Sequence, residues 1–244
     1  MTADTLVESE RVKSGIPGYD EMISGGYFRQ TVNVISGESG TGKTILGSQF
    51  LYEGAKKGEK GLCIMTTESA NSLKKEMYTS FGWDLNELEN SGMISFVDIA
   101  DPELRLQKTV DMAPTELIRS FKNLIDRKIE ENKPARVFID SIEALFLAIE
   151  SPFRLKTLID DLFGVLRSHD VTSVITVGTT FKVESTVEYG ADSVTRLGRV
   201  VSGNNLQRSI YIAKLRGSNT INEIRVLNIS DNGVRVLDQS PYII

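Results

Sequence analysis

The sequence is poor in the residues that build disulfides and many metal centres. Its 244 residues include one cysteine, Cys63, and one histidine, His169. An internal disulfide and a histidine-rich metal site are therefore both excluded. Cys63 stands in an apolar run, where a small buried residue is a better interpretation than a reactive thiol. A chain without disulfides suits a reducing compartment, so we expect a cytoplasmic protein.

Long apolar runs and an excess of positive charge are also missing. No run approaches the ~18 residues that a membrane helix needs, so we expect no membrane insertion. The N-terminus is acidic and lacks the apolar core of a signal peptide. The net charge of −5 argues against a broad grip on nucleic acid, which needs clustered cations, although it leaves room for a local basic groove.

One stretch carries a specific chemical signal. Val34–Thr44 reads VISGESGTGKT and fits the phosphate-loop pattern G-x-x-x-x-G-K-[ST] at every fixed position. An apolar run precedes it and an amphipathic run follows, as a strand and a helix around such a loop require. The loop's glycines let successive N–H groups turn toward one anion, and the positive end of the helix dipole points to the same place. We expect the nucleotide to be bound by Gly37, Glu38, Ser39, Gly40, Thr41, Gly42, Lys43 and Thr44.

Lys43 and Thr44 have separate expected roles within the loop. The Lys43 ammonium can reach the β- and γ-phosphates, and the Thr44 hydroxyl can hold Mg²⁺. ATP and Mg²⁺ are therefore the expected ligands.

Two carboxylates end apolar runs elsewhere in the chain. Asp140 follows Val137–Ile139, and a carboxylate at that end of a parallel strand can support Mg²⁺. Glu68 ends the run that begins at Gly61 and could activate the attacking water. Each could instead be the N-cap of a following helix.

The remaining pattern predicts an α/β fold. Apolar strand and amphipathic helix patterns alternate four or five times, and an antiparallel meander follows. This predicts a mostly parallel twisted central sheet with helices on both faces and a C-terminal antiparallel extension. Residues 1–10 are expected to form a short tail and 11–244 a single domain. We expect loops over 101–114 and 178–189, and a solvated basic cluster at Arg127, Lys128, Lys133 and Arg136.

Several segments together resemble a known family. Ser14–Asp20, Gly25-Gly26, the phosphate loop, Phe81–Asp84, Val137–Ser141 and Arg208–Ser218 match, in order and spacing, the KaiC-type ATPase domain of the RecA superfamily. The resemblance covers nearly the whole chain and is to the single-domain archaeal form. It implies a RecA-like P-loop NTPase fold and a homo-oligomer, commonly a hexameric ring, with ATP bound between subunits.

The resemblance also assigns roles to residues. Lys43 and Thr44 would bind phosphate and metal, Asp140 would support the metal, and Glu68 would be the base that activates water. Lys214 and Arg216, two apart on an expected strand, match the pair that reaches the neighbouring subunit's nucleotide.

Three departures from the family pattern matter. Ser69 replaces the second of the family's paired glutamates, which implies slow hydrolysis. Thr220 stands where a histidine is common, so no nucleoside contact is carried over there. The second domain of the cyanobacterial clock protein, which carries its autokinase activity, is missing, so a clock function is not carried over.

Three functions are compatible with these residues. The first is a slow ATPase that forms nucleotide-dependent rings and acts as a regulator read by an unidentified protein partner. The second is an accessory ATPase of DNA recombination or repair, of the RadA-paralogue type, although glutamates outnumber cations in the relevant loops. The third is an ATP-binding regulator associated with the archaellum motor.

Overall fold

The computed structural model describes residues 10–99, 113–179, 183–218 and 222–242. The strands are β1 (Arg11–Val12), β2 (Tyr27–Phe28), β3 (Val32–Gly37), β4 (Gly61–Met65), β5 (Ile94–Asp98), β6 (Arg136–Asp140), β7 (Thr172–Gly178), β8 (Ser193–Ser202), β9 (Asn205–Leu215), β10 (Arg225–Ser230) and β11 (Gly233–Leu237). The helices are α1 (Tyr19–Met22), α2 (Lys43–Ala55), α3 (Ala70–Phe81), α4 (Leu85–Asn90), α6 (Pro114–Asn132), α7 (Glu143–Phe146), α8 (Pro152–Ser168) and α9 (Val183–Gly190).

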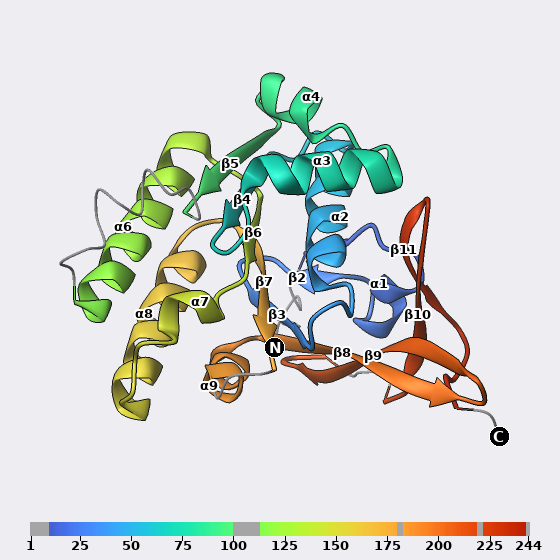
Figure 1. The fold of residues 1–244 in the computed structure, drawn as a ribbon. Coiled ribbons are helices and arrows are strands. Elements are labelled where there is room, and N and C mark those ends of the chain that lie inside the picture. Colours follow the sequence, from blue (N-terminus) through green and yellow to red (C-terminus); the bar gives the residue numbers. More distant parts are fainter. Residues whose placement is uncertain (1–9, 100–112, 180–182, 219–221, 243–244) are drawn as a thin grey trace, which may run out of the picture.

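A nine-stranded sheet organises the molecule (Figure 1). Its strand order is β11-β10-β9-β8-β3-β7-β6-β4-β5. The strands from β8 to β5 are parallel, and β9, β10 and β11 extend the sheet antiparallel from β8. The predicted fold class, including the C-terminal antiparallel extension, is confirmed. A small β1–β2 ribbon, which the sequence reading did not identify, pairs separately.

Helices cover both faces of the parallel part, with α2 and α3 on one side and α6 and α8 on the other (Figure 1). The central strands are buried on both faces and alternate between two hydrophobic clusters. In β6, for example, Phe138 packs on the α2 side, whereas Val137 and Ile139 pack on the α6 and α8 side. Strands buried in this way read as continuous apolar runs, which is why the sequence located them well.

Two glycines bring α2 unusually close to β6. A Cβ on Gly47 would lie 2.0 Å from the Phe138 ring, and a Cβ on Gly54 would lie 2.4 Å from Arg136 Nε. The glycines are seven residues apart and share a helix face, while Phe138 and Arg136 share a strand face. This contact fixes the distance between the start of α2 and the end of β6, where Thr44 and Asp140 lie.

The structure corrects two sequence predictions. Residues 183–190 form α9 rather than a loop. Arg136 is 1% exposed rather than solvated: it pairs with Glu59 at 2.5 Å, donates to the Phe50 carbonyl at 2.7 Å and stacks on the Phe50 ring. The predicted loop at 101–114 falls almost entirely outside the described residues. Within the described chain, no helix is long and apolar enough to cross a membrane.

Candidate functional site

The phosphate loop joins β3 to α2 at the carboxyl edge of the parallel sheet. Gly40 and Gly42 have φ of 75° and 106°, a left-handed backbone that favours glycine. The Thr41 hydroxyl donates to the Glu38 carbonyl at 2.8 Å and braces the turn from inside. The fold thus places a glycine-rich turn directly before a 13-residue helix, the arrangement that binds phosphate groups.

Lys43 lies folded over this loop. Its Nζ donates to the carbonyls of Gly37 at 2.8 Å and Glu38 at 2.9 Å. Burial lowers the pKa of the Lys43 ammonium, and the negative charges of Glu143 and Asp140 oppose that shift. The ammonium is therefore held at the mouth of the loop by two neutral acceptors that a phosphate oxygen can replace.

Asp140 meets Thr44 across the sheet edge. The Thr44 hydroxyl donates to Asp140 Oδ2 at 2.7 Å, and Thr176, from the end of β7, donates to Asp140 Oδ1. Asp140 is 7% exposed, and burial raises its pKa while these two hydrogen bonds and the charge of Lys43 lower it. The alternative of Asp140 as a helix cap is wrong, because α7 is preceded by Ile142 and has no side-chain cap.

This pair fits Mg²⁺. A hydroxyl and a carboxylate oxygen are ligands of the kind that Mg²⁺ accepts, and Mg²⁺ commonly takes few protein ligands beside phosphates and waters. Among the described residues no cluster of three or more metal-binding side chains could hold an ion alone. A magnesium ion at Thr44 and Asp140 would therefore be shared with a bound phosphate.

Glu68 lies at the same edge but is exposed and separate from this pair. Strand β4 pairs with β6 in a register that places Met65 beside Asp140, and the Thr66 N–H donates to the Asp140 carbonyl at 2.9 Å, so the residues after β4 lie next to the end of β6. The alternative of Glu68 as a helix cap is wrong: Ser69 caps α3, accepting from the Ser72 N–H at 3.1 Å. In α3, partial burial and the negative charges of Glu68 and Asp140 raise the pKa of Glu76.

Lys214 and Arg216 do not join the phosphate loop of their own chain. Lys214 Nζ donates to the carbonyls of Glu188 at 3.2 Å and Tyr189 at 2.9 Å. Arg216 pairs with Asp192 at 3.2 Å. Burial, followed by the charge of Arg216, lowers the pKa of Lys214. The two cations thus form a separate group with the exposed ring of Tyr189; Thr220 lies outside the described residues.

Two other arginines do touch the loop, and the sequence reading missed Arg199 altogether. Arg199 Nη2 donates to the Ser39 carbonyl at 3.1 Å, and Arg208 Nε donates to the Gly40 carbonyl at 3.4 Å. Arg199 and Arg208 are opposite each other in the β8–β9 ladder. No local pattern marks them, because only the pairing of these strands and their packing beside β3 carry them to the loop.

Glu143 is the other residue that the sequence reading did not assign to the site. It begins α7, three residues after Asp140, and its Oε1 lies 2.7 Å from where a Cβ on Gly178 would be. Its Oε2 is buried without a hydrogen-bond partner among the described residues. The spacing from Asp140 is the one signal in the sequence that could have drawn attention to it.

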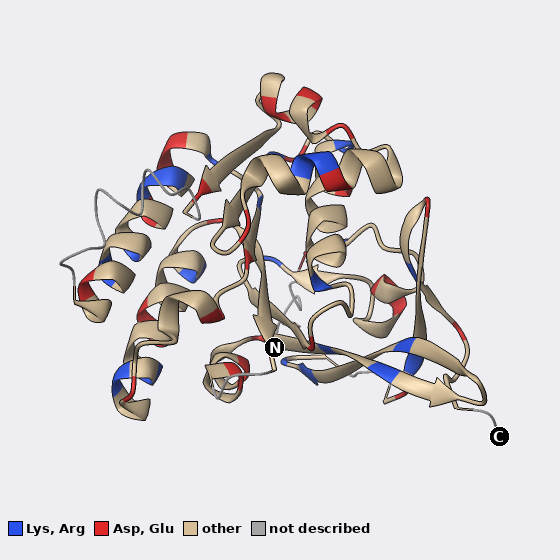
Figure 2. Cartoon of the chain, viewed as in Figure 1, with Lys and Arg blue, Asp and Glu red and all other residues tan. Residues whose placement is uncertain are grey.

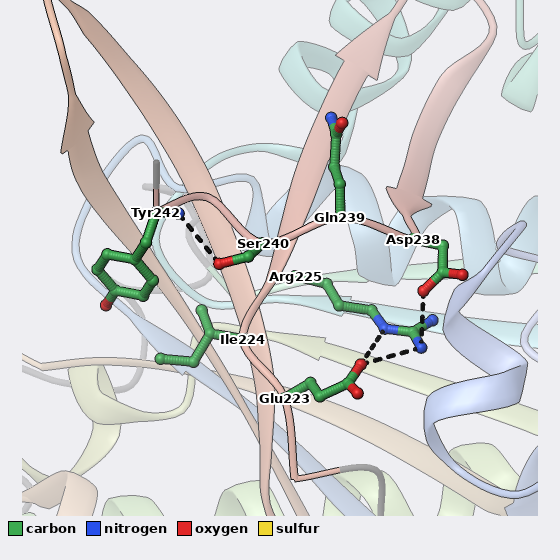
Figure 3. Close-up of a pocket in the computed structure, with 7 residues that line it drawn as sticks. All are labelled: Glu223, Ile224, Arg225, Asp238, Gln239, Ser240 and Tyr242. Carbon is green, nitrogen blue, oxygen red and sulfur yellow. Dashed lines mark hydrogen bonds and ion pairs between the residues drawn. The ribbon is translucent and has the colours of Figure 1, made fainter. Parts of the chain in front are cut away.

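A separate pocket of about 420 Å³ lies between the start of β10 and the C-terminal segment (Figure 3). Arg225 lies in it and pairs with Glu223 at 3.2 Å and Asp238 at 3.0 Å. Its guanidinium charge is thus neutralised by the pocket's own carboxylates. Elsewhere, acidic and basic residues are interspersed on helices such as α6 and α8 (Figure 2).

Comparison with known proteins identifies the family. The family model described as "ATPase: KaiC" matches residues 12–241. A UPF0273 protein of Pyrococcus horikoshii is 32% identical, with 93% of this chain and 94% of that protein covered. Circadian clock protein KaiC3 of a Synechocystis strain is 31% identical over 86% of this chain, which corresponds to 42% of its own length.

A solved structure agrees with these relatives. The crystal structure of a KaiC-like protein from Pyrococcus horikoshii has a TM-score of 0.80 and 31% identity, covering 94% of this chain and 99% of that one. The predicted resemblance is thereby confirmed. The chain belongs to the KaiC ATPase family, within the P-loop ATPases of RecA-like fold.

Proposed function

We propose that this chain is a single ATPase domain over residues 11–244 that binds Mg-ATP, hydrolyses it slowly and assembles into rings, commonly hexamers, whose nucleotide state a partner protein reads. The observation that carries the nucleotide site is the contact of Thr44 with Asp140 at the mouth of the phosphate loop. It joins the start of α2, which follows β3 and the phosphate loop, to the end of β6, a strand that is not adjacent to β3 in the sheet.

The chemistry assigned to the chain's residues is limited to positioning and charge. The loop amides and Lys43 would hold the β- and γ-phosphates, while Thr44 and Asp140 would hold Mg²⁺, which neutralises charge on the phosphates. Water forms the new bond to the γ-phosphorus as the bond to the β–γ bridging oxygen breaks, with its electron pair leaving on ADP. Glu68 takes the proton of the water and returns it to solvent.

The position of Lys214 and Arg216 supports a site shared between copies. Both cations are held at α9 and β8 by carbonyls and by Asp192, and neither donates to residues 37–44 in the described contacts. In a head-to-tail ring the same surface of each copy faces the next copy's loop. The two cations would then stabilise charge on the neighbour's γ-phosphate during hydrolysis.

We attribute slow turnover to Ser69, the residue that follows Glu68. The family's second glutamate is replaced by Ser69, whose hydroxyl is engaged in capping α3. One acidic group instead of two activates the water, so hydrolysis is slow. The signal is then which nucleotide is bound rather than the rate of ATP hydrolysis. A regulator of this kind works by the difference in affinity of its partner for the two states.

The test combines particle size with phosphate release. With Mg-ATP the wild type is expected to form a ring and release phosphate slowly, and Lys43→Ala is expected to lose nucleotide binding and assembly together. An arm with single-stranded DNA tests the recombination alternative, which would show salt-dependent binding and faster hydrolysis. A chain that stays monomeric and releases no phosphate at saturating ATP would contradict the proposal.

A further inference from the structure

Glu143 presents a buried carboxylate oxygen that nothing in the described structure satisfies. Its Oε2 has no hydrogen-bond partner there, although the rest of the side chain is only partly buried. An unpartnered buried polar group costs about 1–3 kcal/mol, and more when it is charged. Such an atom in a native fold points to a ligand, an ion or a water that completes it.

The position of Glu143 is set by three neighbouring strands. Strand β7 lies between β3, which leads into the phosphate loop, and β6, which ends in Asp140. Glu143 Oε1 lies over Gly178, the last residue of β7. The carboxylate therefore lies at the carboxyl end of β7, the strand that separates β3 from β6.

The charge of Glu143 acts on the same region. Burial lowers the pKa of the Lys43 ammonium, and of the two negative charges that oppose this shift, that of Glu143 has a larger effect than that of Asp140. Because Lys43 and the Mg²⁺ residues mark where the γ-phosphate lies in P-loop enzymes, this carboxylate is at the γ-phosphate end of the site. A second anion at that place has to be separated from the phosphate by a hydrogen-bond donor.

A water molecule is the donor that fits. We propose that Glu143, through its unpartnered Oε2, orients the water that attacks the γ-phosphate, whereas Glu68 remains the single base that takes its proton. The inference rests on the proposed ATPase function. Glu143 accepts a hydrogen bond and holds the water in line, while the proton and the leaving electron pair go to Glu68 and to ADP as described above.

Two consequences separate this role from a structural one. The carboxylate repels the γ-phosphate in the ground state, so removing its charge should increase the affinity for ATP relative to that for ADP. Removing it should also slow hydrolysis, because orientation and acid–base contributions of this kind amount to factors of about 100 or more. A structural residue would change the affinities for both nucleotides together.

Gly178 offers an independent way to move the carboxylate. A Cβ there would lie 2.7 Å from Oε1, and the backbone of Gly178 is not in the left-handed region, so alanine is compatible with the strand. Gly178→Ala should push the carboxylate off β7 without removing it. Glu150, an exposed residue after α7, provides the matched charge control.

The experiment compares wild type, Glu143→Gln, Gly178→Ala and Glu150→Gln. Dissociation constants for ADP and for the slowly hydrolysed analogue ATPγS are measured by calorimetry, and hydrolysis is measured in single turnover with the protein in excess over Mg-ATP. Glu143→Gln is expected to raise the ATPγS-to-ADP affinity ratio at least threefold and to lower the hydrolysis rate about a hundredfold. Gly178→Ala should change hydrolysis in the same direction, and Glu150→Gln should match wild type.

Unchanged hydrolysis in Glu143→Gln would overturn the inference, as would equal loss of affinity for both nucleotides. Failure of the proposed function looks different, because wild type itself would then release no phosphate. In that case the affinity ratio alone decides whether Glu143 faces the γ-phosphate.

Discussion

Replacing Gly47 with alanine tests how the fold positions the nucleotide site. The new Cβ would lie 2.0 Å from the Phe138 ring, so α2 and β6 have to separate by more than about 1 Å to regain ordinary contact. Phe138 lies two residues before Asp140, and Gly47 lies three after Thr44. The separation should therefore lengthen the Thr44–Asp140 contact, which is 2.7 Å in the native fold.

The magnitude follows from two opposing effects. Overpacking a core contact costs about 1–3 kcal/mol, whereas alanine in place of a helix-interior glycine contributes about 1 kcal/mol of stability. A net loss of up to about 2 kcal/mol is expected in denaturant unfolding. Because a misplacement of about 1 Å in a site can reduce activity by a factor of about 100, affinity for Mg-ATP should fall at least tenfold.

Gly164→Ala is the matched control for that change. Gly164 is also inside a helix, α8, but nothing lies within 4 Å of where its Cβ would be. The substitution should stabilise the chain by up to about 1 kcal/mol and leave nucleotide affinity unchanged. The reasoning is refuted if Gly47→Ala is as stable as Gly164→Ala and binds Mg-ATP as tightly as wild type.

Three further predictions concern single side chains. Arg136→Ala should cost about 3–5 kcal/mol in denaturant unfolding because it leaves buried polar partners unpaired, and Arg136→Met should cost clearly less; equal losses would contradict the role of its polar contacts. Ser69→Ala should lower the melting temperature by about 2–4 °C, because it removes a helix cap worth about 1 kcal/mol, and should leave phosphate release unchanged. Ser69→Glu should raise phosphate release. A Ser69→Glu variant that is slower than wild type would argue against the missing glutamate as the cause of slow turnover. Glu68→Gln should keep nucleotide binding in calorimetry and abolish hydrolysis, and unchanged turnover would remove Glu68 from its catalytic role.

The parts of the site that depend on local pattern could be predicted from the sequence. The phosphate loop needs its glycines, Lys43 and Thr44 at fixed spacing, and Asp140 follows a continuous apolar run. That Asp140 lies near the phosphate loop could therefore be inferred from the positions of the strand ends alone. The central strands of the sheet could also be predicted from local pattern, because strands buried on both faces read as continuous apolar runs.

The features that were missed depend on long-range packing. Arg136 looks like a surface cation by composition, but its guanidinium is enclosed because Gly54 lets α2 lie against β6. Arg199 reaches the loop only because β8 pairs beside β3. Glu143 lies in a four-residue helix whose sequence alone does not show which strand end its side chain covers.

Mixing two inactive variants tests the shared site most directly. Glu68→Gln inactivates the site of its own copy while keeping nucleotide binding, and Arg216→Ala is expected to damage only the site of its neighbour. In an equimolar ring about a quarter of the sites would pair an intact Glu68 with an intact Arg216. The account predicts that the mixture recovers ATP hydrolysis toward that fraction of wild type, whereas a mixture no more active than the average of the two variants alone would contradict it.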